Sequence, residues 1–508
     1  MPLVSQDNEC ASNQIKVDDF WQNQDFPFSI TKTTKILSLV QKIPVVDPLA
    51  IFQEFAPSNT LRFYWEKPSK HEAVAAWGVT RNLVLESNTR FKKTQEFTRN
   101  CFEQIIKEGD TNLVGSEPRI FCSFSFFPKS DQLEIVSDPE SLSPEKIGKR
   151  SSSQKSRNSS IAESKIENSS PPASIFLPRF QITKKNKSYF LIINFPLHNQ
   201  QEIKPLISRL CQKTKSIDWE KYQQPIINAK KPRDWNNQNL FSAANSGYFK
   251  STVRSALESI AVNELSKIVI AHAIDIRSSV PFDVINSLHN LRDRHSDCYI
   301  FAIGNAQKQN FIGASPERLV SIQNGQLVTD ALAGSAPRGK STSEDLQWAS
   351  ILLKNRKEKR EQKAVSDFIL DKLKLMGLKP HQLPLQLLSL SNIQHLWTPI
   401  YAHLSKDIKP LDVVRQLHPT PAVAGVPRGV VCKKISNYEK FDRALYAAPL
   451  GWVDQDDNCE FVVGIRSALI EQNQARLYAG AGIVSGSNPD KEFIEIQLKL
   501  QSLLKALV

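Results

Sequence analysis

Alternating apolar and polar positions recur along the chain and predict β-strands, whereas apolar residues spaced three and four apart predict helices. Strands are expected over 61–65, 73–79, 118–127, 188–195, 267–276, 299–303, 311–320, 327–332, 459–470 and 475–484. Helices are expected over 91–107, 248–265, 346–376, 411–417 and from 489 onward. Asn324-Gly325 predicts a tight hairpin between two of the strands. The pattern places the chain in the mixed α/β (α+β) class.

One end of the chain combines charged side chains with regular spacing. Residues 459–470 are expected to form a single half-buried strand, in which Arg466 shares a face with small residues and offers its guanidinium to an anion. The helix that follows carries Glu492, Glu495 and Lys499 at i, i+3 and i+7, which places them on a shared face. Two carboxylates and an ammonium beside an arginine-bearing strand indicate a site for a metal and an anionic ligand.

Another acid lies on the predicted buried face of the helix over 346–376. Glu361 is in register with the apolar stripe of that helix, which consists of Ala364, Val365, Phe368 and Leu375. A carboxylate on a buried face is costly unless it is paired or coordinated. Two explanations stay open: an ion pair with a neighbouring lysine, or a divalent cation shared with the acids of the last helix. Oxygen ligands without His or Cys favour Mg²⁺ over zinc in the second case.

Three further places carry groups that could do chemistry. Lys267 begins a buried strand and is either a lysine whose head reaches solvent or a base whose pKa is lowered by burial. Glu317 interrupts a strand after a proline, where it is either a turn residue or a positioned acid. The expected loop over 333–339 contains Gly334 and Ser335, and its backbone N–H groups could face an anion.

Charge and composition narrow the class of protein. The net charge is +13, and eleven of these excess charges lie in 145–187, with ten Lys or Arg and three Glu, and in 354–363, with six and two. These basic residues lack interleaved aromatic residues, which argues against nucleic acid as a partner. No apolar run is long enough to span a bilayer, and no signal peptide is visible. Seven scattered cysteines without metal-ligand spacing indicate reduced thiols in a cytosol-like compartment.

The organisation that we expect is one catalytic domain over 31–508 after a loose leader at 1–30. Residues 141–173 are rich in Ser, Lys, Asn and Glu, which is typical of a disordered surface insertion. The strand after the insertion resembles the strands before it, so a hairpin opened by a long loop explains it without a domain boundary. Within the domain, 31–240 is expected to be a scaffold half and 245–508 a catalytic half.

Eight segments of the C-terminal half resemble the chorismate-utilising enzyme family, which comprises isochorismate, salicylate, anthranilate and aminodeoxychorismate synthases. They are KIVIAHAIDI (267–276), GASPERL (313–319), ALAGSAPRG (331–339), KEKREQ (357–362), HPTPAVAG (418–425), FDRALYAAPLGW (441–452), FVVGIRSALI (461–470) and AGAGIV…DKEFIEIQLKL (479–500). The resemblance implies the fold of that family, with stacked antiparallel sheets and peripheral helices, and chorismate as the substrate.

The resemblance also implies roles for individual residues. Mg²⁺ would be held by Glu361 and Glu495, with Glu492 close by, and would anchor a carboxylate of chorismate. Lys267 would be the base that activates water for attack at C2, and Glu317 the acid that protonates the departing C4 hydroxyl, so its pKa should be raised toward neutrality. The substrate-binding residues that it implies are Gly334, Ser335, His418, Ala422, Arg466, Gly480, Gly482 and Lys499.

Three positions indicate which member of the family the chain resembles. Lys267 stands where anthranilate synthases lack a lysine, Ala333 where aminodeoxychorismate synthases carry a nucleophilic lysine, and Ala422 where the anthranilate enzymes have threonine. These positions converge on isochorismate synthase, and the overall length resembles the menaquinone/phylloquinone-pathway type. Gln362 stands where the family usually has His, so hydrogen bonding behind the adjacent Glu361 is expected to differ.

The resulting expectation is a cytoplasmic, monomeric, Mg²⁺-dependent enzyme that binds chorismate, with neither nucleic acid nor membrane as a partner. The nearest alternative is salicylate synthase, which follows the same first step with elimination of pyruvate. Anthranilate and aminodeoxychorismate synthase are more distant alternatives. A rival from another class is a non-catalytic scaffold that binds RNA through 145–187.

Overall fold

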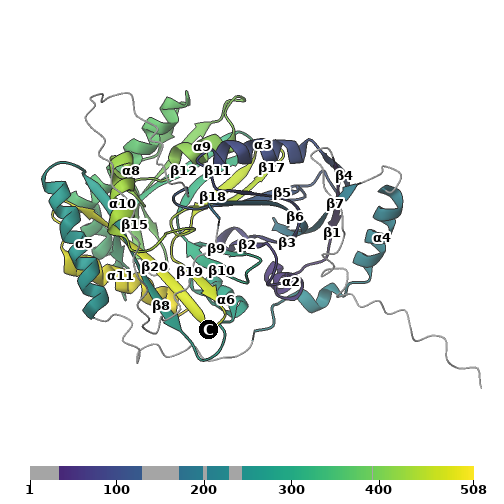
Figure 1. The fold of residues 1–508 in the computed structure, drawn as a ribbon, viewed down its shortest axis with the longest axis horizontal. Helices are drawn as coiled ribbons and strands as arrows, with labels where there is room; N and C mark the ends of the chain where they lie inside the picture. The colour runs from purple at the N-terminus through teal and green to yellow at the C-terminus, as the bar shows by residue number, and fades with distance from the viewer. Residues whose placement is uncertain (1–33, 129–170, 198–202, 228–242, 392, 508) are drawn as a thin grey trace, which may run out of the picture.

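The computed structural model describes residues 34–128, 171–197, 203–227, 243–391 and 393–507 (Figure 1). The expected leader at 1–30 and nearly all of the expected insertion lie outside these residues. Among the described residues, no helix is both long and apolar enough to cross a membrane.

The described strands form one branched, largely antiparallel sheet whose two long arms we call wing 1 and wing 2. Both start at β6 (Ala173–Lys185), which pairs with β3 along one edge and with β5 on the other. Wing 1 runs through β3 (Glu72–Leu85), β2 (Arg62–Lys67), β9 (Tyr299–Gly304), β10 (Asn310–Ser315), β19 (Ser467–Glu471), β20 (Gln474–Val484), β8 (Lys267–Arg277) and β16 (Gly425–Val426). Wing 2 runs through β5 (Arg119–Phe124), β17 (Pro449–Asp454), β18 (Cys459–Val463), β11 (Arg318–Gln323), β12 (Gln326–Pro337) and β15 (Ile393–His403), with β13 (His381–Gln382) and β14 (Gln386–Ser389) at its far edge.

A short extension beyond β6 completes the sheet. It consists of β7 (Ser188–Leu197), β1 (Lys35–Lys42) and β4 (Ile105–Gly109), and β1 pairs with β4 in parallel. One large apolar core contains buried residues from both wings, so the two halves of the sequence fold as a unit.

Helices lie on the outside of the sheet, as expected (Figure 1). α5 contacts β8 and β20 of wing 1, α11 contacts β20 and α5, and α8 contacts β12 and β15 of wing 2. The helices are α2 (Pro48–Phe55), α3 (Arg90–Phe102), α4 (Ile203–Lys215), α5 (Ala243–Ala261), α6 (Val284–Arg294), α7 (Thr342–Lys354), α8 (Arg356–Leu375), α9 (Pro410–Leu417), α10 (Arg428–Tyr438) and α11 (Pro489–Leu504), with short 3-10 turns at Pro68–Lys70 and Trp219–Tyr222. The expected mixed α/β class is confirmed.

Two helix predictions were wrong in their extent. The helix expected over 91–107 ends at Phe102, and Ile105–Gly109 pairs with β1 as a strand. The helix expected over 346–376 is broken at Asn355, whose side chain accepts hydrogen bonds from the first backbone N–H groups of α8. The buried face of α8 is rotated about the helix axis relative to the predicted stripe, and Leu375 is 76% exposed. The residues on the buried face are Gln362, Val365, Ser366, Ile369 and Leu373.

One hairpin prediction is confirmed, and the other holds with a different second strand, because β5 pairs with β6 and not with the strand expected over 188–195. Asn324 and Gly325 both have positive φ, 52° and 76°, and join β11 to β12. β5 and β6 pair antiparallel, with Phe121 opposite Phe176, so the segment between them opens a hairpin within one sheet. The C-terminal limit expected for the insertion was too late, because β6 already begins at Ala173.

Candidate active site

Two neighbouring crossovers between the wings each carry a predicted functional residue. The first crossover joins β10 to β11 and contains Glu317. The second joins β18 to β19 and contains Arg466, so the single strand expected over 459–470 was wrong. Arg466 has a φ of 49°, outside the strand region, because the backbone must turn there to change wings. Arg466 therefore reaches the site from a bend, not from alternation along a strand.

Hydrogen bonds hold the two crossovers side by side. The Ser315 hydroxyl donates to the carbonyl of Val463 at 2.6 Å, and the Val463 N–H donates to the carbonyl of Glu317 at 3.0 Å. The Ala314 N–H donates to the carbonyl of Arg466 at 3.1 Å. These bonds satisfy backbone groups that would otherwise lack partners. The same hydrogen bonds therefore fix the positions of Glu317 and Arg466.

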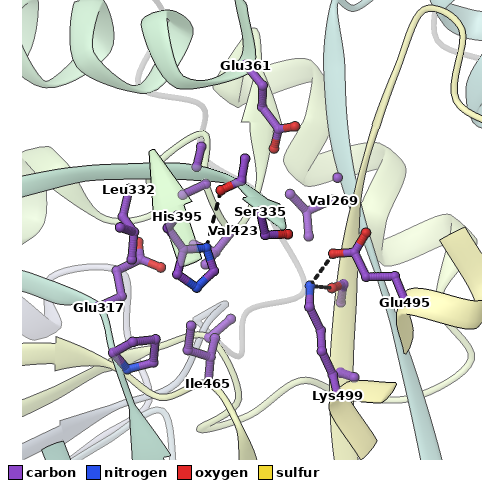
Figure 2. Close-up of a pocket in the computed structure, with 18 of the residues that line it drawn as sticks. Val269, Glu317, Leu332, Ser335, Glu361, His395, Val423, Ile465, Glu495 and Lys499 are labelled. Carbon is purple, nitrogen blue, oxygen red and sulfur yellow. Dashed lines mark hydrogen bonds and ion pairs between the residues drawn. The ribbon is translucent and has the colours of Figure 1, made fainter. Parts of the chain in front are cut away.

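The crossovers open onto a cavity between the wings, which we call the inner cavity. Figure 2 shows Glu317, Glu361 and Glu495 extending toward it from different elements. Most of the predicted site residues line it, namely Glu317, Gly334, Ser335, Glu361, Ala422, Arg466, Gly480, Gly482, Glu492, Glu495 and Lys499. Two predicted residues do not line it, Lys267 and His418.

Glu317 is the acid with the clearest electrostatic signature. Its residue is 5% exposed, and burial raises the pKa of its carboxyl to about 8, although the nearby Lys267 opposes part of the rise. Removing a carboxylate from water favours its neutral form, so Glu317 carries a proton near neutral pH. The expectation of a raised pKa, drawn from the resemblance, agrees with this environment.

Lys267 occupies the first position of β8, between β16 and β20. Its side chain is 2% exposed, and its Nζ donates to Oε1 of Glu361 at 2.7 Å. The interpretation as a lysine whose head reaches solvent was therefore wrong. The ion pair with a lysine, one of the two explanations left open for Glu361, is present.

Lys267 lines a second depression, which we call the outer groove. Its residues are Ile260, Ala261, Asn263, Glu264, Leu265, Ser266, Lys267, Lys357, Arg360, Glu361, Ala364, Val426, Pro427, Val484 and Ser485. Glu361 and Lys357 line both the groove and the inner cavity. The Lys267–Glu361 pair thus stands at the boundary between the two spaces. A Cβ on Gly482, which lines the inner cavity, would come within 3.4 Å of Lys267 Cε and 2.8 Å of Glu361 Oε1.

Besides Glu317, four carboxylates face the inner cavity, two from α8 and two from α11. Burial, followed by repulsion from Glu361, raises the pKa of Glu358, and burial, with a contribution from Glu495, raises that of Glu492. Burial opposes ionisation of Glu495 as well, but the ammonium of Lys499, 2.7 Å away, brings the net pKa of Glu495 below its usual value.

These acids form a set of oxygen donors that suits a hard divalent cation such as Mg²⁺, whose charge would relieve their mutual repulsion. Among the described residues, no three acidic, His or Cys side chains already stand close enough together to hold an ion. The donor set fits by chemistry, and coordination would require Glu361 to turn away from Lys267.

The glycines of β20 keep this region open. A Cβ on Gly480 would approach the hydroxyl of Tyr446 to 2.8 Å. Lys499 donates to the carbonyl of Gly480 at 2.8 Å, which fixes the ammonium beside the strand (Figure 2). In wing 2, Gly334 has a φ of 75° at a bulge of β12 opposite β15, so the expected loop over 333–339 is a bulged strand.

His395 is a site residue that the sequence analysis missed. Its Nδ1 lies 3.3 Å from the carbonyl of Gly334, and its Nε2 lies 3.3 Å from Nη2 of Arg466. Burial, followed by the charges of Arg466 and Lys499, lowers its pKa to about 3, so the ring is neutral and orients the guanidinium. A single histidine in the strand β15 has no spacing that would have marked it. Glu358 was also missed, although its position three residues before Glu361 was a usable signal.

The prediction that His418 lines the substrate site was wrong. The ring of His418 packs edge-on against Phe126 at 5.4 Å between centroids, and its Nε2 lies 3.4 Å from the carbonyl of the same residue. Burial holds its pKa well below the usual value. His418 supports the start of the loop whose later residues, Ala422 and Val423, reach the inner cavity.

Comparisons with known proteins show the family to which the chain belongs. A family model described as chorismate binding enzyme matches residues 23–143 and 149–508. Isochorismate synthase MenF of Bacillus subtilis is 27% identical over 93% of this chain and 93% of its own length. The salicylate biosynthesis isochorismate synthase of Pseudomonas aeruginosa is 30% identical over 92% of this chain and 89% of its own length.

Among solved structures, the menaquinone-specific isochorismate synthase MenF of Escherichia coli superposes with a TM-score of 0.70 at 24% identity, over 96% of this chain and 98% of that one. This likeness concerns the fold. The family match, in contrast, spans both the scaffold and the cavity. The chain belongs to the chorismate binding enzyme family.

Proposed function

We propose that this protein is an isochorismate synthase, which converts chorismate reversibly to isochorismate. The observation that carries the proposal is the buried Glu317, with a pKa near 8, in a cavity that also presents Arg466 and Lys499. A protonated acid facing two cations suits a dianionic substrate that must lose a hydroxyl group. The names of both full-length relatives support the same reaction.

The residues divide the reaction between two ends of the site. A water molecule beside Lys267 loses a proton to the lysine amine as its oxygen forms a bond to C2 of chorismate. Both double bonds of the ring shift, the C4–O bond breaks, and Glu317 gives its proton to the departing oxygen, which leaves as water. One water is consumed and one is released, so atoms and charge balance. The same two groups exchange roles in the reverse direction.

The amine of Lys267 must be free to accept that proton. Its Nζ is held by Glu361 in the arrangement described above. The amine can therefore take the proton of the water only after this ion pair has opened. Arg466, oriented by His395, and Lys499 then bind the carboxylates of the substrate.

Mg²⁺ is part of the proposal, with Glu361 and Glu495 as ligands and Glu358 and Glu492 beside them. When bound, it would neutralise a carboxylate of the substrate and withdraw charge from the ring. We further propose a monomeric cytoplasmic enzyme. The six cysteines of the described residues are all free thiols, which supports such a compartment.

The deciding experiment is product identification. Purified protein incubated with chorismate and Mg²⁺ should yield isochorismate and, from added isochorismate, chorismate. Salicylate with an equal amount of pyruvate would assign the chain to the salicylate synthases instead. No change in chorismate, with an intact fold by circular dichroism, would refute both.

A further inference from the structure

The expected base and the expected acid line different spaces. Glu317 lines the inner cavity, whereas Lys267 lines the outer groove, contacts Glu361, which lines both spaces, and lies next to Gly482 of the cavity wall. The proposed reaction would need only that Lys267 and Glu317 both face the cavity that binds chorismate. The outer groove has no role in the steps described above.

The reaction requires a place for water that chorismate does not occupy. Each turnover consumes one water at C2, on the side of Lys267, and releases another from C4, on the side of Glu317. While chorismate occupies the inner cavity, an opening on the side of Lys267 would give the attacking water a separate way to the base.

The walls of the outer groove suit this purpose. Ser266 and Ser485 are exposed together just beyond Lys267, since the β-ladder places Val484 opposite Lys267 and the next residues of the two strands face each other. Ala364 contributes a small side chain from α8, one turn after Glu361. Hydroxyls, small side chains and the Lys267–Glu361 pair at the inner end can accept and donate hydrogen bonds to water without a bulky barrier.

We propose that the outer groove holds and supplies the water molecule that attacks chorismate, so that nucleophile and substrate reach the site from opposite sides. This inference rests on the proposed function. Water exchange is much faster than a typical enzyme turnover of about 10 s⁻¹. What controls the rate is thus the presence of a water position beside Lys267, not the speed of diffusion through the groove.

The test is to fill the groove from two walls with tryptophan. Ala364→Trp and Ser485→Trp should each lower kcat by about tenfold or more, since activation of the water by the base contributes at least that much. KM for chorismate and the Mg²⁺ concentration at half-maximal rate should stay within about twofold of wild type. Lys359→Trp is the matched control, because Lys359 is exposed on the same helix α8 and lines neither space. It should retain wild-type kcat.

The possible results distinguish a failure of the groove proposal from a failure of the proposed function. If the wild-type protein makes no isochorismate, the proposed function fails before any variant is compared. If the wild type is active and both groove variants keep its kcat, the groove inference fails alone. It also fails if the loss of kcat comes with an equal loss of chorismate affinity, or if Lys359→Trp is equally impaired. Melting temperatures identify a misfolded Ala364→Trp, in which case Ser485→Trp decides.

Discussion

The N-terminal and C-terminal halves of the chain contribute strands to the same sheet but use their buried polar groups differently. In the N-terminal half, Arg62 donates to the side chain of Asn310 and to a backbone carbonyl, and Tyr64 donates to Glu66. In the C-terminal half, the polar groups of Glu317, Arg466 and their neighbours face a cavity. All residues that line the inner cavity and the outer groove lie between 260 and 499.

The residues of the candidate site come from the C-terminal half of the sequence, although strands of the two halves alternate within one sheet. β2 of the N-terminal half pairs with β9, and β5 pairs with β17, so the C-terminal strands depend on N-terminal neighbours. Substitutions in the N-terminal half should therefore change stability without changing chemistry, whereas substitutions around the cavity should do the opposite.

The largest effect on catalysis is expected from Lys267→Ala. Loss of the base should reduce kcat by about 10²-fold or more, while chorismate binding is nearly unchanged, because the amine acts on water. Steady-state rates with calorimetric binding measure both quantities. Turnover equal to wild type would exclude Lys267 as the base.

Glu317→Gln should lower kcat by about 10²-fold, since glutamine fills the same space but cannot give up a proton to the leaving hydroxyl. In the wild type, kcat should decline as the pH rises through about 8, where Glu317 loses its proton, and this decline should be absent from the variant. A pH–rate profile checks the prediction, and an identical decline in both proteins would contradict it.

The same pKa predicts a pH dependence of stability. Because the folded pKa of Glu317 is raised above its unfolded value, the folded state binds more protons between about pH 4.5 and 8. The free energy of unfolding should therefore fall as the pH rises across this window. Denaturant titrations at pH 6 and 8.5 should show a smaller fall in Glu317→Gln than in wild type.

Glu495→Ala should raise the Mg²⁺ concentration needed for half-maximal activity by about tenfold, because one of the proposed oxygen ligands is removed. Lys491→Ala, on the exposed side of the same helix, is the control. An Mg²⁺ titration that matches wild type would remove Glu495 from the proposed metal site.

A smaller effect on catalysis, with a large effect on stability, is expected in the scaffold. Phe63 is 1% exposed and packs against Phe121 at 4.7 Å between ring centroids. Phe63→Ala should lower the free energy of unfolding by about 3–5 kcal/mol through loss of burial and a residual cavity. The kcat of the folded fraction should stay near wild type, and a tenfold loss would show that the two halves are not separable in function.

The smallest effect is expected from deletion of residues 141–170, the greater part of the predicted insertion. Activity with chorismate should be unchanged, because the strands on either side already pair as a hairpin. Rate measurements on the shortened protein test this, and loss of activity would favour the rival in which the basic tract carries the function.

The pattern of residues along the sequence predicted the position of a side chain correctly where that position depends on one helix or strand alone. Helical spacing placed Glu492, Glu495 and Lys499 on one face of α11, and all three line the inner cavity. Glu361 was detected as an acid on the inner side of its helix, although the assumed apolar stripe was out of phase. Gln362, expected to alter hydrogen bonding behind Glu361, instead donates to the hydroxyl of Thr398 and anchors α8 on β15.

Pattern failed where two distant segments meet. Arg466 was assigned to the right site by alternation along a strand that does not exist, because the chain changes wings at that residue. His395 had no local signal, and its part in the site arises from its contacts with Gly334 and Arg466. The outer groove is formed by α5, β8, α8 and the turn after β20, and no single segment indicates it.

The sequence by itself determined the class of fold, most of the strands, and the residue types that gather around an anionic substrate, because periodicity and motif are properties of short segments. The tertiary structure decided that Glu317 is buried, that Lys267 is paired with Glu361, and that Lys267 and Glu317 line separate spaces. Burial and pairing depend on which segments pack together across the two wings, and the free energies that set them come from these long-range contacts.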